Sequence, residues 1–512
     1  MSKLTLRKIR CAARAQHHLL EHNEHSQDAI TAEAPRTNAR LQLLKASVMT
    51  LVTILAGCAV GPDYVQPKTE APAAFSGDDT TYAADAPIAE FWGAFDDATL
   101  SALVGYAVRS NHDLRIALAN LNQARALRRE TQFDQLPTIT ANAARTKARI
   151  SADQSFNGQP QSSVLNTGNI DAAWEIDLFG RVRREVEASR ASEDAIAADL
   201  HAVQVSVIAE VARNYFELRG AQEQYAVAQR NADNQRETLK IAQARLDAGR
   251  GTEFDTVRAE AQLNATLATL PALRATIENT IHRLSVLVGE QPLALRDTLA
   301  PVQALPALPR LVQIGRPEDL LRRRPDVSAA ERRLAAATAS IGVAEGDWFP
   351  RVNFLGEIGF ASASRDGIGD APAATYSYGP SIQWAALDFG HVQARVDQSK
   401  ARQQAALATY QQAVLKALEE TENALVSYGE TRKQLDYLAA STKASDRATE
   451  LAHLRYNGGA ADFLDVLDSE RSQLESEANL SRARTAAATS LVALYKALGG
   501  GWQTAQAVSL AK

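Results

Sequence analysis

Apolar and polar residues alternate strictly in two stretches of the chain. In residues 169–178 the apolar side chains fall on one face of an extended chain and the polar side chains on the other. The apolar set is Ile170, Ala172, Trp174, Ile176 and Leu178, and the polar set is Asn169, Asp171, Glu175 and Asp177. Residues 376–386 repeat the pattern with Tyr376, Tyr378, Ile382, Trp384 and Ala386. A period of two predicts β-strands whose two faces meet different environments.

A weaker alternating stretch precedes each of these strands, "PTITANA" before the first and "PRVNFLGEIGF" before the second. Polar connections that contain glycine separate the two members of each pair, as is typical of turns. We therefore predict two β-hairpins, 137–178 and 350–388, each with a long outer loop.

Long tracts that are poor in glycine and proline follow both hairpins. In the tract 181–248, small apolar residues recur at alternating steps of three and four, which is a heptad seam. Its positions are Ala191, Ala195, Ala198, Ala202, Val205, Ala209, Ala212 and Phe216. Small side chains let helices approach closely, so we expect helices that pack side by side along their length. At about 1.5 Å per residue, this tract would extend roughly 100 Å.

Each long tract ends at a glycine turn and then restarts. Gly249 and Gly459 suit the left-handed geometry that closes a helix. Thr252 and Asp462 follow as candidate N-caps of the next helices. Each tract therefore predicts one arm of a helical hairpin.

Aspartates gather at these restarts. They are Asp255, Asp462, Asp465 and Asp468. Asp255 and Asp465 stand at the third helical position, where a carboxylate favours the helix dipole, but Asp468 lies a turn further in. A second interpretation is that the turns form the narrow end of a tube, where oligomeric symmetry repeats each aspartate as a ring that binds or filters cations. The spacing leaves both interpretations open.

The hairpin and the helical tract occur twice. Trp174 and Gly180 map onto Trp384 and Gly390 at a constant offset of 210 residues, and the offset persists as far as Gly499. Such constancy indicates a duplicated structural unit. The two repeats are 99–289 and 326–499, with an inter-repeat segment, 290–325, and a C-terminal tail, 500–512.

The N-terminus has the features of a targeting segment, 1–57. Residues 34–62 lack Asp and Glu and run apolar into "LAGC", which resembles a bacterial lipobox with Cys58 as the lipidated residue. The alternative is a plain signal peptide with a chance cysteine. Residues 1–40 are an extended leader or the product of a start codon placed too early.

Composition excludes several functions. The formal net charge is −5 and the basic residues form no stripe, so nucleic acid is not an expected partner. Cys11 lies in the leader, so the mature chain has no disulfide framework or thiolate metal site. Catalytic and nucleotide-binding motifs are absent and the mature histidines are scattered singly, so we expect no enzyme activity, cofactor or metal.

Strands are the expected means of crossing a membrane. We find no apolar run of membrane-helix length beyond the leader, and aromatic residues cluster near the strand ends, as in the girdles of outer-membrane barrels. A soluble sheet with one face on a core is the alternative. Because bacterial barrels need about eight strands or more, four strands per chain predict an obligate oligomer.

Three segments carry a resemblance to a known family. They are "CAVGPDYVQP" (58–67), "FWGAFDDATLSALVGYAVRSNHDLRIALANLNQARA" (91–126) and "EDLLRRRPDVSAAERRLAAATASIGVAEGDWFPRV" (318–352). Together with the duplication, they resemble the TolC-like outer-membrane factors of tripartite efflux pumps, in their lipoprotein (NodT-type) branch. The resemblance covers residues 55–503.

The resemblance implies an α+β membrane protein. Three chains would build one twelve-stranded outer-membrane β-barrel, four strands from each, continued by a long periplasmic α-helical coiled-coil barrel. Residues 58–98 would form a lipid-anchored segment and part of an equatorial collar. Ala59, after the lipidated position, would direct the protein to the outer membrane. Asp171, Glu175 and Asp177 would face the barrel lumen.

The resemblance also implies a gate at the periplasmic end. Tyr456, Asp465 and Asp468 match the family's gate positions, and Asp255 and Asp462 are further candidates. Ala461 stands where a family member has an arginine, so we hypothesise that Arg455 or Arg250 takes its place.

The expected function is passive export of small molecules, such as drugs and aromatics, delivered by an inner-membrane pump of the resistance–nodulation–division (RND) type and a periplasmic adaptor. Type I protein secretion through the same architecture is the second hypothesis, and a periplasmic coiled-coil scaffold is the third. The exported substrate cannot be deduced from the sequence.

Overall fold

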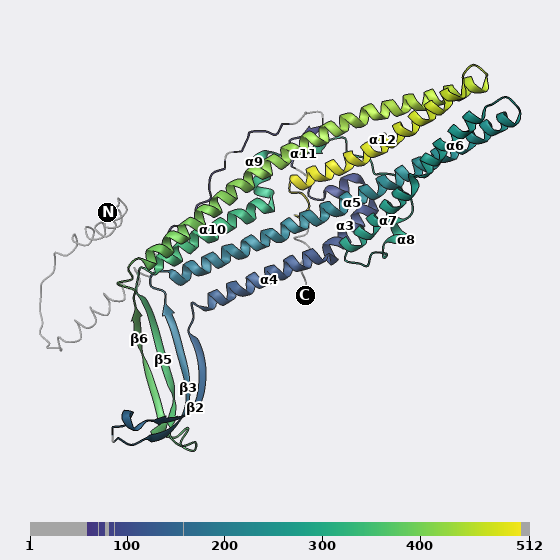
Figure 1. The fold of residues 1–512 in the computed structure, drawn as a ribbon. Helices are drawn as coiled ribbons and strands as arrows, with labels where there is room; N and C mark the ends of the chain where they lie inside the picture. Colours follow the sequence, from purple (N-terminus) through teal and green to yellow (C-terminus); the bar gives the residue numbers. More distant parts are fainter. Residues whose placement is uncertain (1–58, 70, 77–80, 87, 157, 503–512) are drawn as a thin grey trace, which may run out of the picture. The chain divides into compact units, whose positions relative to one another are not determined.

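The computed structural model describes residues 59–69, 71–76, 81–86, 88–156 and 158–502 (Figure 1). The chain divides into two units, Met1–Gly57 and Cys58–Lys512. The predicted targeting segment and Cys58 lie outside the described residues. The fold below is that of the second unit, with element labels as in Figure 1.

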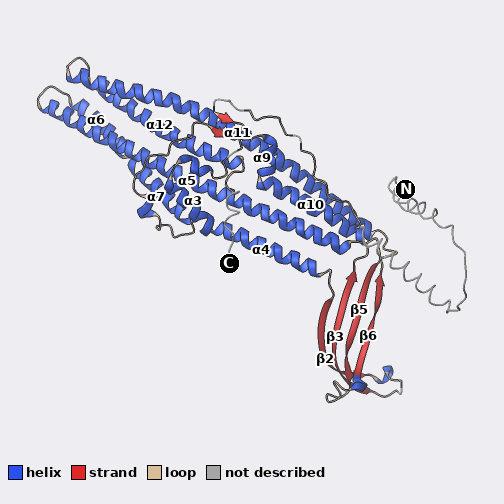
Figure 2. Cartoon of the chain, turned by 180° about the vertical axis from the view of Figure 1, so that it is seen from behind, coloured by secondary structure: helices blue, strands red, loops and turns tan. Residues whose placement is uncertain are grey.

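The strands form one four-stranded antiparallel sheet with the order β2-β3-β5-β6 (Figure 2). Their bounds are β2 Thr138–Ile150, β3 Gln161–Ile176, β5 Arg351–Ser362 and β6 Ala374–Gln383. Both predicted hairpins are present. The sheet reaches further from the helices than alternation alone suggested, because polar strand residues around Lys147 pair fully with β3. A short parallel pair, β1 (Tyr82–Ala83) and β4 (Val312–Gln313), joins the N-terminal and inter-repeat segments.

The helices divide between the two sequence repeats. In the first repeat they are α3 Ala98–Ser110, α4 His112–Phe133, α5 Arg181–Asp247, α6 Glu253–Leu267 and α7 Leu270–Leu287, followed by the short α8 Arg296–Leu299. In the second they are α9 Pro317–Arg323, α10 Pro325–Gly346, α11 His391–Asn457 and α12 Phe463–Ala497. Short 3-10 turns occupy Phe91–Phe95, Ala152–Gln154 and Ala371–Ala373. Both α5 and α11 contain 67 residues, which confirms the long helical tracts.

Helix α5 is the centre of the helical part. It contacts α4 and α7 of its own repeat and α10 and α12 of the other. All the predicted seam residues except Ala202 are buried. The largest hydrophobic cluster combines its middle, around Phe216, with α3, α7 and α12. The predicted lateral packing is therefore confirmed.

One expectation needs correction. Helix α5 contains an apolar window that is long enough to cross a membrane by length and composition, although we expected none beyond the leader. Half of this window is buried inside the chain. A helix that is covered by other helices on most sides becomes apolar all round, and that accounts for the window.

The residues that follow Cys58 are held at the junction between β3 and α5. The Val60 N–H donates to the Phe179 carbonyl at 3.0 Å. The buried Arg184 side chain donates from Nε to the Val60 carbonyl at 3.0 Å and from Nη2 to Asp63 at 2.7 Å. Gly180 has φ +81°, and a Cβ there would lie 2.6 Å from the Ala59 Cα. Only glycine fits at this position, since it must adopt a left-handed conformation in tight contact.

Candidate functional site

The turns between the long helices have the predicted geometry. Gly249 and Gly459 have φ of +68° and +74°. The Arg250 N–H donates to the Arg245 carbonyl at 2.8 Å, and the Ala460 N–H donates to the Arg455 carbonyl at 2.8 Å. These bonds satisfy the Arg245 and Arg455 carbonyls in the last turns of α5 and α11, as is usual where a glycine ends a helix.

The helices restart differently in the two repeats. Thr252 and Asp255 form a capping box: the Asp255 N–H donates to the Thr252 hydroxyl at 3.2 Å, and the Thr252 N–H donates to the Asp255 carboxylate at 3.2 Å. Asp462 stands at the N-cap of α12, but its side chain makes no capping bond. Capping therefore explains Asp255 and does not explain Asp462.

The second-repeat aspartates lie on the surface of the chain. Asp462, Asp465 and Asp468 follow one another at steps of three, which places them on one face of the first turns of α12, and all are exposed. Asp468 pairs with Arg471 at 3.2 Å. The face presents three carboxylates to the surroundings of this chain.

Tyr456 lies at the centre of a small cluster that joins the two tips. It is 8% exposed and packs with Phe463, at 5.4 Å between ring centroids, and with apolar residues of α5, α6 and α12. The Arg245 guanidinium of α5 lies over its ring, 3.9 Å from the centroid. This distance is within the usual range of a cation–π contact.

The arginine against Tyr456 is neither of the two that we hypothesised from the sequence. Arg455, which we hypothesised as a substitute for the missing arginine, instead donates to the Ala460 carbonyl of its own turn at 3.4 Å. Arg250, the other hypothesised substitute, donates its backbone N–H within the turn that ends α5. A signal was present, because Arg245 and Arg455 occupy equivalent positions of the two repeats.

A polar cluster joins α5 to α11 and α12 above the tips. Glu470 is 4% exposed; its Oε1 accepts from the Thr238 hydroxyl at 2.6 Å and lies 3.1 Å from His453 Nε2. Among the described residues, Glu470 Oε2 and both polar side-chain atoms of the buried Gln235 have no hydrogen-bond partner. These residues line a cavity of about 370 Å³. Buried polar groups with unsatisfied hydrogen-bonding capacity make this contact weaker than an apolar core would be.

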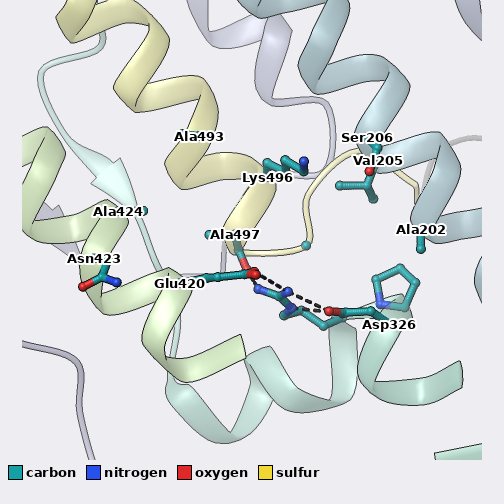
Figure 3. A pocket seen from close by; sticks show the side chains of 13 residues that line it. Ala202, Val205, Ser206, Asp326, Glu420, Asn423, Ala424, Ala493, Lys496 and Ala497 are labelled. Atoms are coloured by element: carbon teal, nitrogen blue, oxygen red, sulfur yellow. Dashed lines mark hydrogen bonds and ion pairs between the residues drawn. The ribbon is translucent and has the colours of Figure 1, made fainter. Parts of the chain in front are cut away.

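A second cavity lies where the two repeats meet in the middle of the helices. It has a volume of about 500 Å³, and α5, α10, α11 and α12 line it (Figure 3). The buried Arg324 donates to Asp326 at 2.7 Å, to Glu420 at 2.6 Å and to the Ala497 carbonyl at 3.1 Å. Burial raises the pKa of Asp326, but the hydrogen bonds and charge of Arg324 outweigh burial and hold it below its usual value.

The three acidic residues predicted to face a lumen have partners within the chain. Asp171 accepts from Asn169 at 2.8 Å. Glu175 forms a two-pronged ion pair with Arg181 at 2.9 Å. Asp177, which follows the end of β3, accepts from the Arg183 N–H at 2.9 Å. Glu175 and Asp177 thus hold the first turn of α5 against the sheet.

One face of the sheet is apolar and exposed. Its large side chains range from 37% to 77% exposure: Trp174, Phe354, Ile358, Tyr376, Tyr378, Ile382 and Trp384. Opposed pairs such as Trp174 with Phe354 and Ile170 with Ile358 keep these residues on the same face. An apolar surface of this extent is typical of a face that meets lipid or protein rather than water.

A sheet with an apolar outer face, joined to a duplicated long helical hairpin, defines a subunit of an outer-membrane channel. The chain belongs to the outer membrane efflux protein family, whose model matches residues 103–290 and 317–500. Members of this family are channel proteins.

Proteins and structures similar to this chain agree with that assignment. Nodulation protein T of Rhizobium leguminosarum bv. trifolii is 30% identical over 450 residues, covering 88% of this chain and 96% of the relative. The toluene efflux pump outer membrane protein TtgI of Pseudomonas putida is 30% identical over 474 residues, covering 90% and 99%. The outer-membrane channel OprN is 43% identical, with a TM-score of 0.81 over 87% of this chain and 100% of that one. The open-state MtrE channel of Neisseria gonorrhoeae is 31% identical, with a TM-score of 0.76 over 87% and 99%.

The fold is therefore that of the trimeric outer-membrane efflux channels, with a β-barrel in the outer membrane and a helical tunnel in the periplasm. The protein is the outer-membrane component of an efflux system. Type I protein secretion, our second hypothesis, is not favoured, since the relatives are components of efflux pumps.

Proposed function

We propose that three copies of this chain form one channel, which receives small apolar and aromatic compounds from an inner-membrane RND-type pump through a periplasmic adaptor. The apolar outer face of the sheet carries this proposal, because four strands cannot close a barrel alone. Relatives named for solvent and toluene efflux support the substrate class. Deleting the gene should raise cellular accumulation of dyes and aromatic compounds, and unchanged accumulation of the whole panel would exclude this role.

The tips are the proposed gate. In the closed channel, the exposed face of Asp462, Asp465 and Asp468 forms part of a ring that three subunits share and that repels anions. The Tyr456 cluster and the polar contacts of Glu470 hold α11 and α12 against α5. Both contacts are small compared with the central hydrophobic cluster, so the tips separate more easily than the middle of the helices. Docking of the adaptor on the tips would favour the separated state.

The conductance of single channels tests this gate. Replacing both Asp465 and Asp468 with alanine should raise single-channel conductance in planar bilayers, because a ring of carboxylates and its bound cations would be lost. Asp297→Ala, an exposed carboxylate of α8 away from the tips, is the matched control. Unchanged conductance in the double variant would leave these aspartates with a purely structural role.

Acylation of Cys58 is the proposed anchor. Arg184 and the contact between Ala59 and Gly180 fix the following residues at the end of β3, where the sheet meets the helices. A lipid on Cys58 would therefore enter the inner leaflet of the outer membrane beside the barrel. The mature chain should incorporate an alkyne-labelled fatty acid, and Cys58→Ser should abolish the labelling. Labelling that survives Cys58→Ser would contradict the assignment.

A further inference from the structure

Basic residues continue the outer face of β2 where its apolar residues end. Arg145, Lys147 and Arg149 alternate along the strand on the face that carries Ile139, and all three are exposed. The register with β3 puts them on the same face as Trp174, which is the exposed apolar face of the sheet. In an outer-membrane barrel, this face is turned away from the lumen. The outer face of β2 therefore changes from apolar to basic toward the loop that follows the strand.

The charges of the sheet are sorted between its two faces. The carboxylates of the four strands are Asp171, Glu175 and Glu357, and the register places all of them on the opposite, inner face. Among the described residues, none of the three basic side chains of β2 has an ion-pair partner. A row of three cations on a strand face without carboxylates lacks a counter-charge within the chain, so its counter-charge comes from the surroundings.

The position of this basic row along the strand places it at the outer edge of the membrane. Trp174 marks the inner edge, because tryptophan favours the interface of lipid and water, and its indole N–H donates to the Gln135 carbonyl at 3.0 Å, where the sheet meets the helices. The register sets Trp174 level with Pro137. Lys147 lies ten residues further along, a rise of about 25 Å at about 3.3 Å per residue and a tilt of roughly 40°. The apolar band of such barrels is also about 25 Å tall, so the row straddles the level at which acyl chains end and head groups begin.

The basic row belongs to the first repeat alone. Strand β5 is the equivalent of β2 in the second repeat: β2 begins at Thr138 and β5 at Arg351, an offset of 351 − 138 = 213 residues. At the places of the three basic residues, β5 has Ile358, Phe360 and Ser362. A strand of the same barrel thus occupies the same depth without a cation, so building the barrel does not require the row. A ligand at that depth accounts for its presence.

We infer that the basic row of β2 binds the phosphate groups of the glycolipid that forms the outer leaflet of a Gram-negative outer membrane. The head groups of this glycolipid carry phosphates and lie at the depth of the row. The guanidinium groups of Arg145 and Arg149 can each bind two phosphate oxygens, and the Lys147 ammonium adds a third cation. Alternate residues of a strand lie about 7 Å apart, so the row covers about 13 Å and can meet more than one phosphate.

The neighbouring residues of β3 fit the same ligand. Ser162 and Val164 oppose the last two basic residues of the row. The exposed Ser162 hydroxyl suits a sugar or phosphate oxygen, and Val164 suits an acyl chain. Asn166 opposes the first basic residue, and its buried side chain donates to the Ser362 carbonyl at 3.1 Å, which joins β3 to β5. The site therefore lies on β2 and β3, outside the lumen, and the inference goes beyond the proposed export.

Binding of a labelled glycolipid to the full-length protein in detergent tests this inference. The probe is fluorescent rough-type lipopolysaccharide, and its anisotropy measures the affinity. The triple variant Arg145→Gln, Lys147→Gln and Arg149→Gln should bind at least about tenfold more weakly than the parent, since each cation near an anionic lipid surface strengthens binding by about fivefold. Enzymatic removal of the phosphates from the probe should weaken binding by the parent to the same extent. Inorganic phosphate alone should not displace the probe at millimolar concentration.

A matched variant removes three exposed basic residues of the helices, Arg230→Gln, Arg250→Gln and Lys443→Gln, and should bind the probe as the parent does. Equal weakening in the two triple variants would show a general effect of net charge and overturn the site. Equal affinity of the parent and the β2 variant, or displacement by inorganic phosphate alone, would also overturn it. If the β2 variant forms no trimer, Lys147→Gln alone decides: it should bind about fivefold more weakly, and the affinity of the parent in this variant overturns the inference. None of these outcomes bears on export, which the accumulation of aromatic compounds measures separately.

Discussion

Helices α5 and α11 have the same length and the same place in their repeats, but opposite surroundings. Helix α5 is covered by helices of both repeats, and its middle, around Tyr215 and Phe216, is fully buried. In the described part of the chain, helix α11 packs mainly on α10 and α12, and many of its apolar side chains, such as Leu415, are exposed. The difference shows that one structural unit serves as the interior of a subunit in its first copy and as the boundary of a subunit in its second.

The partner helices differ too. The first repeat continues from its tip through two helices, α6 and α7, with Pro271 at the start of α7. The second continues through one helix of 35 residues, α12. Proline lacks an N–H and interrupts the helical hydrogen bonds, so this arm of the first hairpin is divided into two helices where that of the second is one continuous helix. A continuous rod transmits movement at its tip along its length, which suits the hairpin proposed to open.

Gly220 and its equivalent Glu430 give the largest expected contrast. Gly220 is buried on α5, and a Cβ there would lie within 3 Å of three side-chain atoms of Thr485 on α12, whereas Glu430 is exposed. Gly220→Leu should therefore lower the free energy of unfolding by about 3 kcal/mol, and Glu430→Leu should change it little. The temperature at which the trimer dissociates on gels compares the two variants. Equal effects of the two substitutions would contradict the interior role of α5.

The alanine seams allow a sharper contrast. Ala195→Leu overfills a packed site inside the chain and should destabilise the folded subunit by about 1–3 kcal/mol. Ala405→Leu, its exposed equivalent, should leave the subunit folded but weaken the trimer. Protease resistance of the monomer and the trimer fraction in detergent separate the two effects. An Ala405→Leu variant with a normal trimer fraction would show that α11 is not at a subunit boundary.

Arg245 and Arg455 test the gate in the same paired way. Arg245→Ala removes the contact with Tyr456 that joins α5 to α11, a contact of about 0.5–2 kcal/mol, and should raise the open probability of single channels. Arg455→Ala removes only a bond within its own turn and should have a smaller effect. Planar-bilayer recordings of both variants measure the difference. An open probability that rises more in Arg455→Ala would reverse the assignment.

The smallest expected effect is a dependence on acid pH. The pKa of Asp326 is held below its usual value of about 4 by Arg324, so this pair stabilises the fold above that value and loses its contribution as pH falls through the lowered pKa. Asp326→Asn should therefore lose less stability than the parent as the pH falls. Thermal unfolding of both proteins below about pH 5 measures this difference. An equal fall in stability of the two proteins would mean that the ion pair contributes nothing.

Local patterns were sufficient for much of the fold. Alternation predicted both hairpins, the heptad seam predicted α5, and Gly249 and Thr252 predicted the turn and cap that the structure shows. The constant offset predicted the duplication. These features depend on residues close in sequence or on comparison of the chain with itself.

Contacts between distant segments could not be predicted in this way. The Arg245–Tyr456 contact and the bond of Thr238 to Glu470 join helices more than 200 residues apart, and the sequence gives no distance between them. Arg184 likewise holds a segment about 120 residues before it. The register of the helices decides which polar side chains are buried, and here it buries Gln235 without a hydrogen-bond partner among the described residues.

The mass of the detergent-extracted protein tests the central claim most directly. If the exposed sheet of each chain is one third of a shared barrel, light scattering should give a particle of three chains that requires detergent to remain in solution. A single chain that stays soluble without detergent would contradict the account.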